Sequence, residues 1–181
     1  MKRHIKLITI ILFTSCITMP DYEIEKNTSK EYNAQILFET GNSELEKTIV
    51  AFNLLKINRL GITAPAFSHV KIIIGDRVWE THPRHGVLCN RFDGITEGRT
   101  FVDIWLPNIE DVISKLEHAD TTANEYNFTG AAALGQYTLT GIYIGRSNPE
   151  TYHCASLVAY AIGVKEWWKC DLVDLWILVN N

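Results

Sequence analysis

Cys154 is the side chain whose position in this sequence is most suggestive of covalent chemistry. It belongs to the segment 152–163, for which we predict a helix that ends at Gly163, and it falls in the first turn of that helix. Unpaired amides and the helix dipole stabilise an anion there, so a thiol at this place has a lowered pKa and can act as a nucleophile. Apolar residues follow Cys154 at helical spacing, so we expect the thiol to point inward. The alternative is a small buried apolar side chain, the usual role of a free cysteine.

A β-hairpin is predicted around Gly75 and Asp76, because strand-like segments at 67–74 and 77–81 flank this tight-turn pair. A two-residue loop fixes the cross-strand pairs: Ile74 with Arg77, Ile72 with Trp79, and Val70 with Thr81. One face of the hairpin is then mostly apolar. The opposite face carries His69, Lys71, Ile73, Val78, Glu80 and His82.

His69 on this second face is our candidate for the base that a thiol nucleophile needs. Glu80, diagonal to it on the neighbouring strand, can accept the imidazole N–H and fix the tautomer. Each residue also has an ordinary interpretation. A histidine on a strand is often structural, and Glu80 faces Lys71, with which it can form a surface ion pair of little energy.

The elements that must position these residues indicate one α+β domain. A strand is predicted at 35–38, a helix after the Ser43 capping box, another strand at 99–106 and another helix after Asn108. The first helix shows an apolar stripe that we expect to pack in the core: Leu45, Ile49, Phe52 and Leu55. The segment 129–135 is helix or loop and receives no role. We expect an antiparallel sheet or partial barrel, packed by the Cys154 helix.

The N-terminus predicts export. Residues 1–6 are basic and residues 7–13 almost wholly apolar, which is the pattern of a signal peptide. The apolar run is shorter than the roughly 20 residues of a spanning helix. Cys16 follows small residues and is our candidate lipidation site; cleavage by an ordinary signal peptidase and a retained signal anchor are the alternatives. We therefore divide the chain into a signal peptide (1–15), a polar tether (16–33) and a folded domain (34–181).

Charge and cysteine content narrow the function further. The chain has 17 Lys and Arg against 21 Asp and Glu. Loss of residues 1–15 removes three cations and no acid, which leaves 14 against 21, a balance of −7. This negative charge does not support binding to nucleic acid or to an anionic membrane surface. The lipid anchor is therefore the only membrane contact we expect. Three cysteines remain beyond Cys16, an odd number, so at least one cannot pair within the chain.

The segments 67–80 and 153–158 resemble the histidine strand and the cysteine helix of NlpC-type papain-like peptidases. In that family the cysteine helix ordinarily comes first, whereas here His69 precedes Cys154, as in the circularly permuted branch that includes YiiX and YaeF. The family often has Gly where Lys71 stands. The resemblance implies a permuted papain-like fold, with Cys154 as nucleophile, His69 as base and then acid, and Glu80 as the residue that orients the imidazole.

The same resemblance implies acyl transfer to the thiolate, followed by hydrolysis, without a cofactor. An amide bond in a cell-wall peptide is the first expectation, and a lipid amidase, thioesterase or acyltransferase stays open. Two other classes also stay open. One is a metal site at His82, His85 and Cys89, which lacks an evident fourth ligand. The other is a catalytically silent binding lipoprotein. The sequence leaves the oligomeric state unknown.

Overall fold

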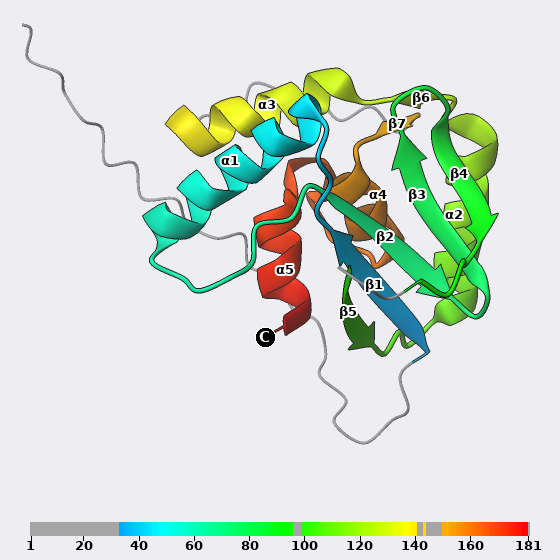
Figure 1. The fold of residues 1–181 in the computed structure, drawn as a ribbon. Helices are drawn as coiled ribbons and strands as arrows, with labels where there is room; N and C mark the ends of the chain where they lie inside the picture. The colour runs from blue at the N-terminus through cyan, green and yellow to red at the C-terminus, as the bar shows by residue number, and fades with distance from the viewer. Residues whose placement is uncertain (1–32, 96–98, 141–142, 144–149, 181) are drawn as a thin grey trace, which may run out of the picture.

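The sheet that carries the hairpin is antiparallel and has five strands in the order β4-β3-β2-β1-β5. In this computed structural model, residues 33–95, 99–140, 143 and 150–180 are described. The strands are β1 (Ala34–Glu39), β2 (His69–Ile74), β3 (Arg77–His82), β4 (Gly86–Arg91) and β5 (Arg99–Ile104). The predicted α+β class with an antiparallel sheet is therefore confirmed (Figure 1).

The β2–β3 hairpin has the register that its turn predicts. Ile72 pairs with Trp79 and Ile74 with Arg77, and Gly75 has the positive φ of 62° that the tight turn requires. Ile72 and Trp79 are fully buried. The apolar face of the hairpin is thus the core face of the sheet, as its alternation indicates.

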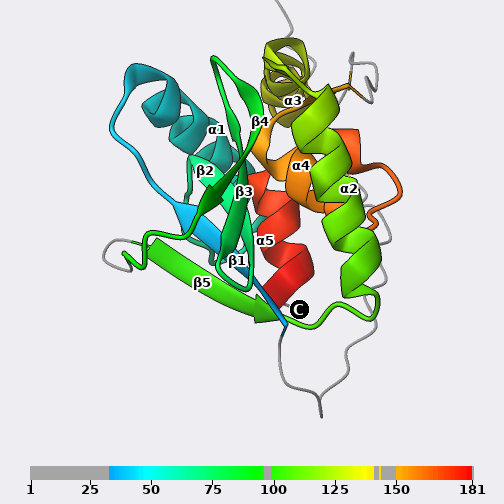
Figure 2. The same cartoon turned by 90° about the vertical axis from the view of Figure 1, so that its right-hand side faces the viewer.

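Helices cover this core face. Figure 2 shows α2 (Ile109–Thr122), α4 (Cys154–Ala161) and α5 (Leu172–Asn180) on one side of the sheet. Two further helices, α1 (Glu44–Leu60) and α3 (Phe128–Thr140), lie side by side at one end of the sheet (Figure 1). Short segments complete the architecture: β6 (Glu125–Tyr126) pairs in parallel with β7 (Thr151–Tyr152), and a 3-10 helix spans Trp167–Lys169. The helix predicted after Asn108 is α2, and its cap is the Asn108 side chain, which accepts a hydrogen bond from Asp111 N–H.

The start of α1 is as predicted, but its buried face is only partly so. Ser43 and Glu46 form the reciprocal capping box. Of the apolar stripe expected in the core, Leu45 and Leu55 are exposed at 47% and 52%, whereas Phe52 is half-buried and Ile49 packs against the core. The helix instead buries a face that carries Asn53, Lys56 and Ile57.

Buried polar contacts explain this orientation of α1. Lys56 Nζ lies 2.6 Å from a carboxylate oxygen of Asp171 and 2.6 Å from one of Asp174, and all three side chains are at most 10% exposed. The amide of Asn53 donates to the Phe67 carbonyl at 2.6 Å. A buried charge is tolerated only when it is paired, so these contacts fix the rotation of α1 about its axis.

The predicted signal peptide, Cys16 and nearly all of the predicted tether lie outside the described residues. Among the residues that are described, no helix is long and apolar enough to cross a membrane.

Candidate active site

Cys154 is the first residue of α4, in the first turn as predicted. His153 is the N-cap, and its Nδ1 accepts a hydrogen bond from the Ser156 backbone N–H at 3.3 Å. The Ser156 hydroxyl in turn accepts from the His153 backbone N–H at 2.9 Å. Cys154 is only 5% exposed and contacts the hydrophobic core, so the thiol does point inward.

The structure brings His69 and Glu80 to the thiol, although Cys154 is far from both in the sequence. His69 is the first residue of β2, and its imidazole forms a hydrogen bond with the Cys154 side chain. His69 Nε2 lies 3.1 Å from Glu80 Oε2, which leaves Nδ1 as the nitrogen that can serve the thiol. The side chains of His69 and Glu80 are 21% and 20% exposed. A base held by a carboxylate beside a nucleophile is the arrangement of a catalytic triad.

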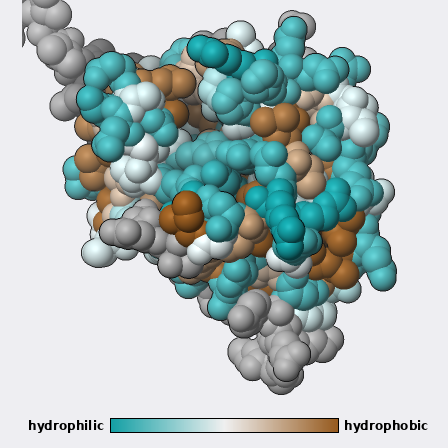
Figure 3. Space-filling view, turned by 45° about the vertical axis from the view of Figure 1, so that its right-hand side comes forward, coloured by the Kyte–Doolittle hydropathy of each residue, from teal (hydrophilic) through white to brown (hydrophobic). Residues whose placement is uncertain are grey.

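Glu80 also contacts Lys71, as the alternative interpretation of this residue expects. Lys71 Nζ lies 3.3 Å from Glu80 Oε2 and 2.9 Å from Glu39 Oε2. Arg99 then joins Glu39 at 2.7 Å and Asp93 at 2.7 Å. Hydrophilic residues accordingly cover much of the outer side of the sheet (Figure 3).

The charges of this chain of ion pairs favour a protonated His69. This series of ion pairs contains three carboxylates (Glu80, Glu39 and Asp93) and two permanent cations (Lys71 and Arg99). One negative charge is therefore left over, and an imidazolium at His69 balances it. Since Glu80 serves both partners through the same oxygen, it is a structural ion-pair member and a support for His69 at once.

The electrostatics of the site shift all three pKa values toward an ion pair. Burial by itself raises the pKa of the Cys154 thiol, but the neighbouring side chains of His153 and His69 bring it down to about 6. Burial lowers the pKa of His69, and the hydrogen bonds to Cys154 and Glu80 outweigh it and raise the pKa to about 9. Burial likewise raises the pKa of Glu80, while His69 and Lys71 hold it at about 2. Thiolate and imidazolium therefore coexist near neutral pH.

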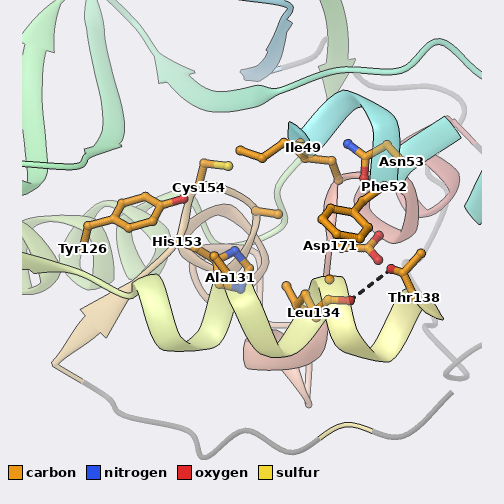
Figure 4. Close-up of a pocket in the computed structure, with 13 residues that line it drawn as sticks. Ile49, Phe52, Asn53, Tyr126, Ala131, Leu134, Thr138, His153, Cys154 and Asp171 are labelled. Carbon is orange, nitrogen blue, oxygen red and sulfur yellow. Dashed lines mark hydrogen bonds between the residues drawn. The ribbon is translucent and has the colours of Figure 1, made fainter. Parts of the chain in front are cut away.

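Tyr126 belongs to the same site, and sequence reasoning missed it. The parallel pairing of β6 with β7 places Tyr126 opposite Tyr152, two residues before Cys154. Its hydroxyl oxygen accepts a hydrogen bond from the Cys154 backbone N–H and points at this residue in Figure 4. Burial raises the pKa of Tyr126, and the nearby thiolate raises it further, so the phenol stays neutral and keeps its proton. No sequence signal marks this residue, because β6 is only two residues long.

A pocket of about 70 Å³ opens beside the thiol (Figure 4). Helix α1 contributes Ile49, Phe52 and Asn53, and helix α3 contributes Ala131, Leu134, Gly135 and Thr138. Tyr126, His153, Cys154, Ala155, Asp171 and Leu172 complete the lining. The segment 129–135, left without a role in the sequence, is therefore one wall of the pocket, and it is helical.

The metal alternative is not supported by the geometry of β3 and β4. The rings of His82 and His85 stack at 4.8 Å. Cys89 is paired with Trp79, three residues before His82, and so lies on the other face of the sheet, where it contacts the core. The described part of the chain has no group of three potential ligands that could hold a metal ion. Among the described residues Cys89, Cys154 and Cys170 are all free thiols.

Comparison with known proteins gives two partial similarities. No model of a known protein family matches the chain. An L-methionine gamma-lyase of Fusobacterium nucleatum subsp. nucleatum is 33% identical over 101 residues, which are 55% of this chain and 24% of the lyase. An L-methionine gamma-lyase of Fusobacterium nucleatum subsp. polymorphum is 30% identical over 118 residues, 65% of this chain and 28% of the lyase. The chain thus spans about a quarter of the length of the curated relatives that it matches.

Proposed function

We propose that this protein is a cysteine hydrolase that cleaves an amide bond through a thiolate–imidazolium pair and an acyl-enzyme. The observation that carries the proposal is the Cys154–His69–Glu80 arrangement, in which the pKa of the thiol falls to about 6 and that of the imidazole rises to about 9. A structural cysteine in an apolar core has a raised pKa instead, as burial produces at Cys170.

The reaction proceeds in two balanced steps. The Cys154 thiolate attacks the carbonyl carbon, the C–N bond breaks, and the amine leaves with the proton of the His69 imidazolium. Neutral His69 then takes a proton from water, whose oxygen attacks the thioester. The C–S bond breaks and the carboxylic acid is released. His69 keeps the proton taken from water, so the thiolate–imidazolium pair is restored.

The oxyanion of each tetrahedral intermediate has the Tyr126 hydroxyl as its candidate donor. The backbone N–H of Cys154, at the start of α4, donates to the Tyr126 oxygen, so the phenol proton itself is free to be donated. Because the Tyr126 pKa is raised, its proton is available for donation throughout the neutral range. Fixed donors aimed at developing negative charge are worth more in a buried site than in water.

The reversed order of His69 and Cys154 supports a circularly permuted papain-like fold of the NlpC type for this α+β domain. The basic, apolar start and Cys16 support an exported lipoprotein of the cell envelope, with residues 34–181 as the hydrolase domain. A peptide of the cell wall is the substrate that suits this location. A lipid amide is the second candidate, because the pocket beside the thiol is mainly apolar.

Active-site labelling tests the proposal. Iodoacetamide at pH 7 should alkylate Cys154 in the folded protein, and mass mapping should show the label lost in Cys154→Ala. Hydrolysis of peptidoglycan fragments, followed by mass spectrometry, should likewise require Cys154. A thiol that resists the reagent would favour the catalytically silent alternative. Consumption of L-methionine by the Cys154→Ala variant would instead show that the similarity to the lyases extends to activity.

A further inference from the structure

The pocket beside Cys154 contains a buried hydrogen-bond donor that the protein does not use. His153 is 3% exposed, and its Nε2 has no hydrogen-bond partner. Its Nδ1 accepts from the Ser156 N–H, so in the neutral ring the single proton is on Nε2. A buried polar group without a partner is costly, which indicates that something absent from the free protein completes it.

The other polar side chains that line the pocket are already engaged. Asn53 donates to the Phe67 carbonyl and Thr138 to the Leu134 carbonyl. The carboxylate of Asp171 is occupied by Lys56 and by two backbone N–H groups. Of the described residues that line the pocket, His153 alone has a buried side-chain nitrogen or oxygen without a partner. The rest of the lining is mainly apolar.

The position of His69 decides which part of the substrate enters. The leaving amine must contact His69, because the imidazolium gives it a proton. His69 does not line the pocket, whereas Cys154 and Tyr126 do. The leaving group therefore stays on the side of the sheet, and the pocket faces the acyl side of the scissile bond.

The size of the pocket limits the acyl group. One water needs roughly 10–15 Å³ by the measure used for cavities, and the pocket has about 70 Å³. This space suits a branched aliphatic side chain better than a long fatty-acyl chain.

We propose that this pocket is an acyl-side subsite for a leucine-sized apolar residue, and that His153 Nε2–H donates to a second carbonyl oxygen in the same acyl part. The inference rests on the proposed function and names its substrate class: a peptide or N-acylated amino-acid amide with a small apolar residue on the acyl side of the cleaved bond.

Three affinity labels of Cys154 test the subsite. N-acetyl-leucine chloromethyl ketone should alkylate Cys154 at least about ten-fold faster than the N-acetylglycine reagent, since even one methylene in an apolar pocket is worth roughly ten-fold or more. A leucine-type chloromethyl ketone that lacks the acetamide should lose several-fold in rate. Each rate is divided by the iodoacetamide rate of the same protein, which removes differences in thiolate content.

Matched variants test separately the apolar contact in the pocket and the hydrogen bond from His153 Nε2–H. Ala131→Leu fills the pocket and should abolish the leucine preference, whereas Ala132→Leu on the exposed side of the same helix should keep it. His153→Asn keeps an N-cap acceptor for the Ser156 N–H but removes the Nε2 donor, so the acetamide should no longer change the rate. Equal rates for leucine and glycine reagents, or an acetamide effect that survives in His153→Asn, overturn the inference. If iodoacetamide itself fails to label Cys154, the proposed function fails instead.

Discussion

The charge state of Cys154 is the property on which the proposed chemistry depends, and His69→Ala is the perturbation that isolates it. The neighbouring side chains of His153 and His69 lower the thiol pKa from an ordinary 9.0 to about 6 against an opposing effect of burial. This difference corresponds to about 4 kcal/mol of stabilisation of the thiolate relative to the thiol. Without His69 the burial remains while a large part of the compensation is lost, so the pKa should rise by two to three units, roughly 3–4 kcal/mol.

The assay is the pH dependence of Cys154 alkylation by iodoacetamide, mapped by mass spectrometry. In the wild type the rate should rise through about pH 6 and be near its plateau at pH 7, since about 90% of the thiol is then ionised. In His69→Ala the rate at pH 7 should be only a few per cent of the variant's own plateau. Comparison with that plateau removes the change in nucleophilicity that accompanies a change in pKa.

Controls for this assay come from the chain itself. His118→Ala changes an exposed histidine of α2 and should leave the profile in place. Cys170 is fully buried, and burial raises its thiol pKa well above the ordinary value. Labelling at this position therefore reports unfolding. Cys89 is half-buried, and its sulfur accepts a hydrogen bond from Arg77 at 3.3 Å, so mass mapping must separate its signal. A wild-type midpoint above pH 8, or one that His69→Ala does not move, would refute the ion pair.

Four further outcomes are expected. Glu80→Gln should move the alkaline limb of hydrolysis below about pH 9, because loss of the carboxylate lowers the pKa of its imidazole partner; an unmoved limb in a pH–rate profile contradicts this role. Tyr126→Phe should reduce turnover by about 10²-fold while alkylation of the thiol continues, as loss of an oxyanion donor does. In urea unfolding, Lys56→Met should cost about 3–5 kcal/mol because it leaves two buried carboxylates unpaired, whereas Lys47→Met, in an exposed pair on the same helix, should cost at most about 1 kcal/mol. Cys16→Ala should move the protein from the membrane fraction to the soluble fraction, and retention in the membrane contradicts lipidation.

Features set by neighbours in the sequence could be predicted without the structure. The Gly75 turn and the alternation of apolar residues fix the β2–β3 register, and that register places Glu80 within reach of His69 across only 11 residues. The start of α1 at Ser43 follows from a capping box of four residues, Ser43 to Glu46. In each case the decisive interaction is local, so the pattern contains the information.

The meeting of Cys154 with His69 was predictable only through the family resemblance, because nothing local in either segment specifies the other. What the sequence determined by itself is therefore a candidate nucleophile at a helix start and a candidate base supported by a carboxylate. It also indicated an α+β domain of one core.

Tertiary structure alone decided which groups other than His69 and Glu80 lie around Cys154. Two residues of the α1 stripe, Leu45 and Leu55, are exposed, because the helix is rotated so that Lys56 pairs with Asp171, 115 residues away. Tyr126 reaches the thiol through a two-residue strand pairing, and His153 has an unused donor only because the packing of the chain buries it. Burial and long-range pairing depend on how distant segments pack, and such packing leaves no period or motif in the local sequence.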